Sequence, residues 1–409
     1  MGLPVSQIRR QFPLLSEAME GHPLVYLDSA ATTQKPDVVL QAMDTFYETA
    51  NANVHRGMHG LAEAATNAYE NARVTVQRFL HAQHSEEIIF TKNATEGINL
   101  VARSLGDTWR KGDAVIVSAL EHHSNIVPWL QLKEEKDIDV RWADIDDIGI
   151  VSVDDIDRHL ADGNVKMVAV TGQSNVLGTK PDLTHIIRKA HEAGAVVLVD
   201  AAQFAAHDTI DVQSLDCDFL VFSSHKVYGP TGIGVLYGKK ELLAAMPPFL
   251  GGGMMIQEVT HSGFTSADLP QKFEAGTPPI AEAVGLASAL DWLGQFSLED
   301  RATHEQQLLK AALDMLHEVR GVRVLGPGYA EQISGCVSFT TDGVHAHDLT
   351  DLLGKRGFCL RAGHHCTQPL HARLGIPASS RLSVGIYNTE EEIRALGPAI
   401  ADILTRFNA

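Results

Sequence analysis

Two apolar runs that each end in polar side chains constrain the fold more than any other part of the sequence. Ala195–Val199 is rich in β-branched residues and is followed by Asp200. Such runs are typical of strands that are buried on both faces of a parallel sheet. Phe219–Phe222 is a second run of this kind, and the segment Ser223–Lys226 follows it. Because ligands of open α/β sheets bind at the carboxyl edge of the strands, we expect these polar side chains to meet there.

This set of side chains is the one that pyridoxal phosphate needs. The cofactor takes a lysine for its Schiff base, an acid that keeps the ring nitrogen protonated, and small polar donors for its phosphate. An aspartate at a strand end is more often a helix cap or turn former, and a single lysine is usually solvated. The combination of Asp200-x-x-Gln203, Ser223-x-His225-Lys226 and a following G-P-x-G-x-G is much rarer. The combination therefore favours a pyridoxal phosphate site.

These residues resemble the site of the class V aminotransferase-like family. Two further motifs, R-A-G-H-H-C at Arg361–Cys366 and S-N-V-L-G at Ser174–Gly178, resemble those of the SufS-type (group II) cysteine desulfurases. The resemblance runs from about Gln11 to the C-terminus. It implies fold type I of the pyridoxal phosphate-dependent transferases, an α/β fold. Such a fold has a large, mostly parallel seven-stranded sheet domain and a smaller C-terminal α/β domain.

The resemblance also implies a domain organisation. We expect residues 21–285 to form the large cofactor-binding domain, and residues 1–20 and 286–409 to form the small domain that carries the catalytic cysteine loop. A long apolar helix begins near the expected boundary, at Ala281–Trp292. Another helix is expected after Pro36, where apolar residues recur with helical spacing and should face the core. These residues are Val38, Val39, Ala42, Met43, Phe46 and Tyr47.

Charge and cysteine content narrow the class of protein. The formal net charge of −18 argues against nucleic acid or an anionic membrane as the main partner, since both require clustered cations. The four cysteines have no paired spacing and no C-x-x-C, which fits a reducing compartment. The sequence lacks a run of about 18 apolar residues that could span a membrane. We therefore expect a cytoplasmic enzyme.

The resemblance assigns roles in cofactor binding to the two strand ends. It implies that Lys226 forms the Schiff base, that Asp200 holds the pyridinium nitrogen and that Gln203 binds the ring 3-oxygen. Ser223 and His225 are expected to bind the phosphate.

A second phosphate contact is expected where the strand at Ile88–Thr91 leads through a polar turn into a helix. A phosphate binds well to the free N–H groups of a helix start, so Thr95 is the candidate contact, although an ordinary helix cap is the alternative. The desulfurase pattern usually has a threonine where this chain has Ala94. The backbone must then supply more of the binding.

A histidine pair lies in the segment Glu121–Asn125. Such pairs are often structural, but the resemblance assigns His123 to stacking on the cofactor ring and to proton transfer. An imidazole titrates near neutral pH, so it can both take and return a proton.

Cys366 is the candidate nucleophile. The other cysteines, Cys217, Cys336 and Cys359, lie in segments of core-like sequence, and free cysteine packs well as a small hydrophobe. Cys366 instead lies in a polar loop whose groups favour the thiolate. Zinc binding by His364, His365 and Cys366 is an alternative, but adjacent ligands do not easily form a tetrahedron. We expect no metal. The expected reaction is attack of the Cys366 thiolate on the sulfur of L-cysteine, which leaves a persulfide on the enzyme and releases L-alanine.

The resemblance places substrate-binding residues in several loops. Arg381 matches the position that clamps the substrate carboxylate in a bidentate pair, with Arg361 as a helper. Asn175 is expected to donate to the substrate carboxylate or to a cofactor hydroxyl. His55 and Arg56 are expected at the rim of the site.

Two further features concern a metal and a second subunit. His55 and His59 have a spacing that could bind zinc on a helix, but Gly57 and the absence of an H-E-x-x-H glutamate argue against it. In the resembling fold, the threonine of the A-G-T-P turn, here Thr277, reaches the phosphate of a neighbouring subunit. This implies a homodimer with shared sites.

The expected function is a pyridoxal phosphate-dependent cysteine desulfurase that supplies sulfur for iron–sulfur cluster assembly, with selenocysteine as a further possible substrate. The rivals on this scaffold are a selenocysteine lyase, a class V aminotransferase and an epimerase. A non-enzymatic sulfur-relay protein is the rival of another class, and it would not need Asp200, Lys226 and His123. The resemblance implies a SufE-like or a zinc-dependent SufU-like sulfur acceptor, and His347 in the H-A-H-D segment resembles a residue used with the latter.

Overall fold

A seven-stranded sheet lies at the centre of the computed structural model, which describes residues 2–407. The strand order is β4–β10–β9–β8–β7–β5–β6, and β10 alone among these strands runs antiparallel to its neighbours. The predicted α/β class with a large, mostly parallel sheet is confirmed. The strands are β4 (Ile88–Thr91), β5 (Ala114–Ser118), β6 (Asp139–Ala143), β7 (Val165–Thr171), β8 (Val196–Asp200), β9 (Phe219–Ser223) and β10 (Gly234–Gly238).

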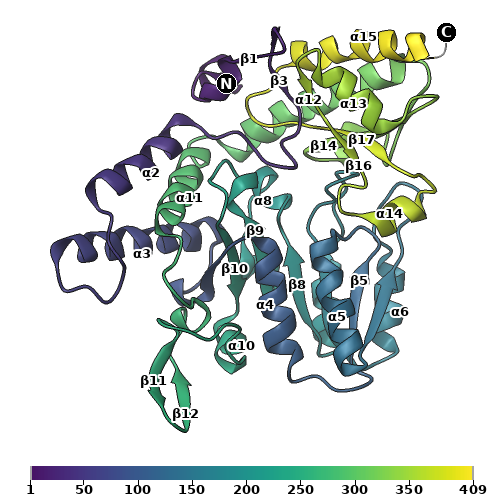
Figure 1. Ribbon diagram of the computed structural model, residues 1–409. Coiled ribbons are helices and arrows are strands. Elements are labelled where there is room, and N and C mark those ends of the chain that lie inside the picture. Colours follow the sequence, from purple (N-terminus) through teal and green to yellow (C-terminus); the bar gives the residue numbers. More distant parts are fainter. Residues whose placement is uncertain (1, 408–409) are drawn as a thin grey trace.

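Helices cover both faces of this sheet (Figure 1). Apolar side chains of α3, α6, α7 and α11 pack on one face, and those of α4 and α5 pack on the other. All residues of β5 and β9 are buried, which explains the uninterrupted apolar runs, because both faces of these strands meet a helix layer. The helices are α3 (Gly60–Leu80), α4 (Ala94–Gly106), α5 (Val127–Lys136), α6 (Val153–Ala161), α7 (Leu183–Glu192) and α11 (Ile280–Leu293).

A smaller antiparallel sheet, in the order β13–β14–β17–β16, forms a second layer near the C-terminus. It packs with α12, α13 and α15 around a hydrophobic core of its own. The N-terminal segment joins this core through Leu27, and β3 (Val25–Tyr26) pairs in parallel with β15 (Phe358–Cys359). The other elements are α12 (Leu298–Glu318), β13 (Val322–Val324), β14 (Cys336–Thr341), α13 (Ala346–Gly354), β16 (Arg361–Gly363), β17 (Ser379–Ser383) and α15 (Glu390–Phe407).

The N-terminal residues contact both the large-sheet layer and the smaller C-terminal layer. α1 (Val5–Arg9) places Arg9 2.7 Å from Glu392. The ring of Phe12 lies 4.8 Å from that of Tyr387 and 5.4 Å from that of Trp292, measured between centroids. The N-terminal segment therefore contacts both α11 and the C-terminal part of the chain.

The predicted domain boundary between residues 285 and 286 falls inside α11. This helix is continuous and packs against α2 (Asp37–Thr49) and α3. The division into 21–285 and 1–20 with 286–409 thus stays a prediction, and residues 1, 408 and 409 lie outside the described part of the chain.

The helix expected after Pro36 is α2, but its core-facing side is narrower than predicted. Val39 and Phe46 are buried, whereas Val38 and Tyr47 are 43% and 55% exposed. Each of the two exposed residues is the chain neighbour of a buried one, so it points about 100° away from the core-facing side.

Two smaller features matter for the site. A short helix, α14 (Gln368–Arg373), lies where the smaller layer meets the carboxyl edge of the large sheet, above β5 in Figure 1. A hairpin of β11 (Ile256–Thr260) and β12 (Gly263–Ser266) projects from the opposite end. Within residues 2–407, no helix combines the length and the apolar content that crossing a membrane requires. The remaining elements are β1 (Ala18–Met19), β2 (His22–Pro23), α8 (Phe204–His207), α9 (Val212–Leu215) and α10 (Lys240–Ala245).

Candidate active site

A cavity of about 230 Å³ lies at the carboxyl edge of the large sheet, where the smaller layer covers it. Asp200, Lys226 and Cys366 all line it, although they come from three distant parts of the chain. The sequence-predicted residues in its lining are Thr95, Asn175, Asp200, Gln203, Ser223, His225, Lys226, Arg361, Cys366 and Arg381.

Asp200 and Lys226 are two ionisable residues of the cavity lining, and each affects the pKa of the other. Asp200 ends β8, is 4% exposed, and its Oδ1 accepts a hydrogen bond from Ala202 N at 2.9 Å. Burial raises the pKa of the Asp200 carboxyl, against the effect of that hydrogen bond and of the Lys226 cation. Burial lowers the pKa of Lys226 to about 8, with the Arg381 cation acting in the same direction and Asp200 opposing it. The amine of Lys226 therefore loses its proton more readily than that of an ordinary lysine.

The start of α4 forms another wall of the cavity. Asn93 caps the helix, with its side chain accepting from Glu96 N at 2.9 Å, and the exposed Thr95 follows it. Ser223 Oγ accepts a hydrogen bond from Ala94 N at 2.9 Å. The Ser223 hydroxyl hydrogen is then left to donate to a ligand, near the N–H of Thr95, since the N–H groups of Ala94, Glu96 and Gly97 are already bonded. Ala94 has no hydroxyl of its own, but its backbone N–H orients the hydroxyl of Ser223.

His225 and Gln203 complete this wall. Burial, followed by the Lys226 and Lys35 cations, lowers the pKa of His225 to about 4, so its imidazole is neutral at physiological pH. Gln203 Nε2 donates to Ala30 O at 2.8 Å. An amide nitrogen carries two hydrogens, so one N–H of Gln203 stays available to a ligand.

The structure corrects the choice between the two histidines, because His122 and not His123 lines the cavity. His122 Nδ1 accepts a hydrogen bond from Ser124 N at 3.1 Å, which places the proton of the neutral ring on Nε2. Burial, followed by the Lys226 cation, lowers the pKa of His122 to about 3. The sequence contained no signal for this choice, because the two imidazoles are adjacent and only the backbone path after β5 decides which one faces the cavity.

His123 contacts the cysteine loop instead. Its backbone N–H donates to Cys366 O at 2.7 Å, and its ring Nε2 accepts a hydrogen bond from Gln368 N at 3.0 Å. Burial and the nearby His364 imidazole lower the pKa of His123, which keeps the ring neutral as an acceptor.

An aspartate that sequence reasoning missed organises the two arginines. Asp28 Oδ1 lies 3.2 Å from Arg381 Nη2, and its Oδ2 lies 3.3 Å from Arg361 Nε. Arg381 is 2% exposed and donates from Nη1 to Asn175 O at 2.8 Å. Its buried Nε has no hydrogen-bond partner among residues 2–407. The sequence pattern that could have identified Asp28 is an acidic residue just after the short strand β3.

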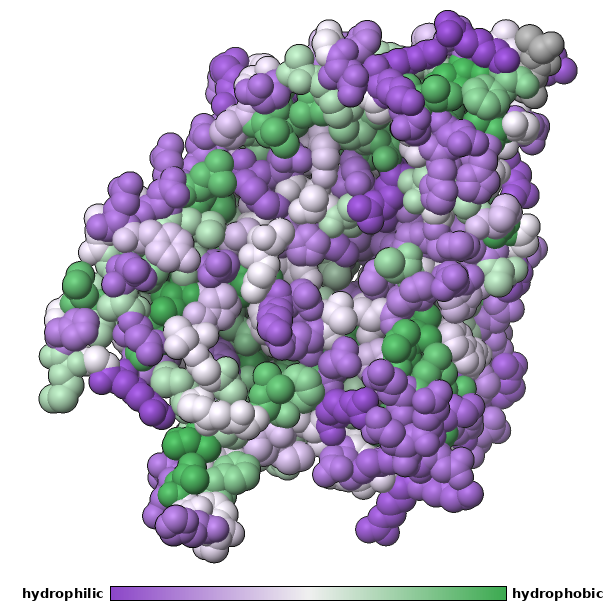
Figure 2. Space-filling model, viewed as in Figure 1, coloured by the Kyte–Doolittle hydropathy of each residue, from purple (hydrophilic) through white to green (hydrophobic). Residues whose placement is uncertain are grey.

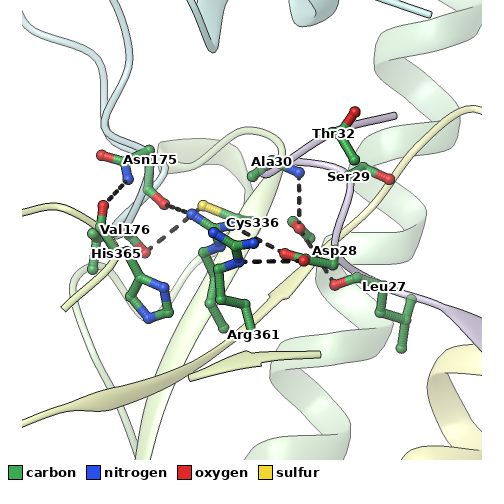
Figure 3. A network of polar contacts seen from close by, with 12 residues as sticks. Leu27, Asp28, Ser29, Ala30, Thr32, Asn175, Val176, Cys336, Arg361 and His365 are labelled. Carbon is green, nitrogen blue, oxygen red and sulfur yellow. Dashed lines mark hydrogen bonds and ion pairs between the residues drawn. The ribbon is translucent and has the colours of Figure 1, made fainter. Parts of the chain in front are cut away.

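The cysteine loop has a strained backbone. His365 and Cys366 are consecutive non-glycine residues with φ of 50° and 59°, and each such residue costs on the order of 1 kcal/mol. His365 is buried, and its Nε2 lies 3.1 Å from Ser379 Oγ. Its carbonyl oxygen accepts a hydrogen bond from Asn175 Nδ2 at 2.8 Å (Figure 3). The loop therefore holds its shape through contacts with both layers.

The chain resembles known proteins along nearly its whole length. The family described as aminotransferase class-V matches residues 25–396. A relative from Streptomyces coelicolor, named probable cysteine desulfurase, is 46% identical over 400 residues, covering 96% of each chain. The apo structure of a cysteine desulfurase from Thermococcus onnurineus NA1 superposes with a TM-score of 0.94, at 36% identity and with 99% of each chain covered.

Another solved structure is the cysteine desulfurase CsdA from Escherichia coli, in an S-sulfonic acid form. It has a TM-score of 0.89, is 40% identical and is covered over 99% of each chain. The chain belongs to the aminotransferase class-V family, among the cysteine desulfurases. The predicted family, fold type I and pyridoxal phosphate as the cofactor are thereby confirmed.

The cavity fits the cofactor of this family. A buried carboxylate, Asp200, is stable only beside a cation, and a protonated ring nitrogen supplies one. The Thr95 N–H at the start of α4, with the hydroxyls of Thr95 and Ser223, suits a phosphate. Lys226 would hold the aldehyde carbon. The ring nitrogen, the phosphate and the aldehyde of pyridoxal phosphate therefore each find a matching group in the cavity lining.

Three predicted residues lie away from the cavity of their own chain. His55 Nε2 pairs with Glu70 at 2.8 Å, and Arg56 is exposed. Thr277 is exposed and lines a separate cavity of about 150 Å³ with Thr91 and Glu96. These three residues could contribute only to the corresponding cavity of a second chain.

The cysteines differ as predicted in their surroundings. Burial raises the pKa of the thiols of Cys217, Cys336 and Cys359, to about 11 for Cys336. Cys366 is exposed and lines the cavity. His59, from the alternative zinc pair with His55, instead caps α3 by accepting from Ala62 N.

Proposed function

We propose that this enzyme converts L-cysteine to L-alanine and retains the sulfur as a persulfide on Cys366. One observation carries the proposal: Cys366, which is exposed, lines the same cavity as Lys226 and Asp200. The probable cysteine desulfurase from Streptomyces coelicolor, 46% identical, supports the same reaction.

The substrate carboxylate is bound by Arg381, with Arg361 at the entrance. Asp28 and the Asn175 carbonyl each accept one hydrogen bond from a terminal nitrogen of Arg381, and the second hydrogens of Nη1 and Nη2 are left for an anion. Arg361 is 48% exposed in its side chain and pairs with Asp28 at 3.3 Å. The two arginines together select an α-amino acid by its carboxylate.

Proton transfer is assigned to Lys226. When bound, pyridoxal phosphate would supply an electron sink for the carbon skeleton of the substrate. Asp200 stabilises the positive charge on the ring nitrogen. Lys226, whose pKa is lowered to about 8, can take and return a proton at the α-carbon. His122 replaces His123 as the imidazole beside the cofactor, where its neutral ring can donate a hydrogen bond from Nε2.

The Cys366 thiolate then attacks the substrate sulfur. The sulfur–sulfur bond of the persulfide forms as the Cβ–sulfur bond breaks, and the electron pair of that bond stays on the carbon skeleton. Protonation of this carbon, and return of a proton to the α-carbon by Lys226, complete the alanine skeleton, and alanine with its amino group would leave when Lys226 takes its place on the cofactor. The persulfide keeps the transferred sulfur on the exposed loop, ready for an acceptor.

We further propose a homodimer in which Thr277, His55 and Arg56 reach the partner's site. The exposed apolar side chains of Val38, Tyr47, Val259 and Phe264 support a second chain near α2 and the β11–β12 hairpin. Figure 2 shows apolar surface on this hairpin, at the lower left.

Iron–sulfur cluster assembly is proposed as the destination of the sulfur, in the cytoplasm, through a SufE-like or SufU-like acceptor. His347 supports the latter, because a Cβ on Gly363 would lie 3.4 Å from its Nε2, which puts the imidazole beside the strand that leads to Cys366. Selenocysteine is proposed as a further substrate of the same site.

The test is a single turnover of the cofactor-loaded protein with L-cysteine. We expect alanine and a 32-dalton increase on the peptide containing Cys366. Turnover of selenocysteine alone would favour a lyase, and transfer of the amino group to a keto acid would favour an aminotransferase. A colourless protein that carries sulfur without forming alanine would favour the relay protein.

A further inference from the structure

The loop that carries the nucleophile must hold a fixed position although its own backbone is strained. It leaves the smaller sheet at Gly363, reaches the cavity at Cys366 and continues into α14. Thr367 N and its hydroxyl both bond to His364 O, at 2.8 and 2.7 Å, which closes a tight turn around the cysteine. These contacts are internal to the loop, so they fix its shape but not its place over the large sheet.

The apolar side chain of Leu370 in α14 packs in the core of the large layer, and a small number of polar contacts fix the loop beside it. Asn175 Nδ2 donates to His365 O, and Arg373 Nε lies 2.8 Å from Asp144 Oδ1 on the exposed side of α14. His123 makes hydrogen bonds with both chain neighbours of Thr367. Its backbone N–H donates to Cys366 O at 2.7 Å, and its ring Nε2 accepts from Gln368 N at 3.0 Å. His123 is therefore the residue in this set that contacts the cysteine itself.

The Gln368 N–H lies in the first turn of α14, where no helical carbonyl accepts it. A neutral imidazole is the group that satisfies this donor. His123 directly follows His122, which lines the cavity. The hydrogen bonds of His123 therefore connect the cysteine loop to the segment that carries His122.

We propose that His123 is a positioning residue that anchors the Cys366 loop over the cavity through its ring Nε2, an inference that rests on the proposed function for the role of Cys366. Loss of this acceptor leaves the thiol in place for only part of the time. Binding of cofactor and of cysteine is unaffected, because His123 lies outside the cavity lining. The transfer of sulfur to Cys366 becomes slower.

The test compares His123→Ala, His123→Gln and the unchanged cofactor-loaded protein. All three keep the backbone bond to Cys366 O, so only the ring contact differs. Glutamine can place its Oε1 near the position of the imidazole Nε2 and accept from Gln368 N. The first readout is hydrogen exchange of the 364–372 segment without substrate. One hydrogen bond contributes up to about 1.4 kcal/mol, so we expect Gln368 N–H exchange about tenfold faster in His123→Ala and restored in His123→Gln.

The second readout is the pre-steady-state rate of persulfide formation. We expect a decrease of about three- to tenfold in His123→Ala, with the cofactor absorbance and its response to cysteine unchanged, and recovery in His123→Gln. Unchanged exchange in His123→Ala would overturn the anchor, whatever the activity. An altered cofactor response to cysteine would also overturn it, because His123 would then act at the cofactor. Failure of the unchanged enzyme to form a persulfide would refute the proposed function and leave the exchange result standing.

Discussion

The side-chain amide of Asn175 donates a hydrogen bond to the main-chain oxygen of His365 at 2.8 Å. The carbonyl of the same asparagine accepts from Arg381 Nη1, also at 2.8 Å. Asn175, in the loop that follows β7, therefore contacts both the cysteine loop and the buried Arg381. The proposed carboxylate site and the proposed nucleophile are fixed relative to each other through Asn175.

Replacement of the nucleophile separates binding from sulfur transfer. We expect Cys366→Ala to keep the visible absorbance of the lysine-bound cofactor and its response to cysteine, but to form no protein-bound persulfide. Alanine formation should fall at least about a hundredfold, since the attacking group is absent. Cys359→Ala is the control, because Cys359 is half-buried and outside the cavity. Normal sulfide release from Cys366→Ala would contradict the assignment.

Asp200→Asn keeps the shape of the side chain and removes its charge. A hydrogen bond to a charged group contributes about 1.5–3 kcal/mol, so we expect alanine formation to slow by about 10- to 100-fold. Because burial raises the pKa of Asp200, removing its charge relieves a cost in the cofactor-free protein, whose thermal stability should not fall. The checks are single-turnover rates and melting of the cofactor-free protein. Full activity of Asp200→Asn would show that the ring nitrogen has another partner.

Ser223→Ala tests whether the serine compensates for the missing hydroxyl at Ala94. The change removes a donor for the phosphate and the acceptor of Ala94 N. We expect the dissociation constant of pyridoxal phosphate to rise about tenfold or more, as for loss of a hydrogen bond to a charged group. Fluorescence titration of the cofactor-free protein measures this constant. Ser124→Ala, on the opposite wall, provides the control, and equal effects of the two variants would argue against the compensation.

His365 should make stability depend on pH. Burial, followed by the Arg381 cation, lowers the pKa of His365 to about 2 from its ordinary 6.5. The unfolded chain then binds a proton that the folded chain does not, so stability is complete above about pH 6.5 and falls as the pH drops toward 2. Between pH 7 and 5 the loss is about 2 kcal/mol.

The measurement is the free energy of unfolding in urea at pH 7 and at pH 5. His365→Gln should reduce the difference between the two values by about 2 kcal/mol, even though it is less stable at both because the contact with Ser379 is altered. The exposed His22 provides a matched His→Gln control. An identical pH dependence in His365→Gln and the unchanged protein would contradict the expected titration.

The sequence by itself determined the local parts of this protein. Uninterrupted apolar runs identified β8 and β9, because a strand covered on both faces has no polar position. The residues that directly follow such strands, including Asp200 and Lys226, could then be placed at one sheet edge without coordinates. The polar context of Cys366 likewise distinguished it from the three cysteines whose thiol pKa values burial raises.

Only the tertiary structure decided between groups that are equivalent in sequence. His122 and His123 are adjacent and chemically identical, and the backbone path after β5 turns one to the cavity and the other to Gln368 N. Asp28 became visible as the partner of Arg381 only when segments 353 residues apart came together. Side-chain chemistry is local and can be read along the chain, whereas the direction in which a loop presents each side chain depends on long-range packing.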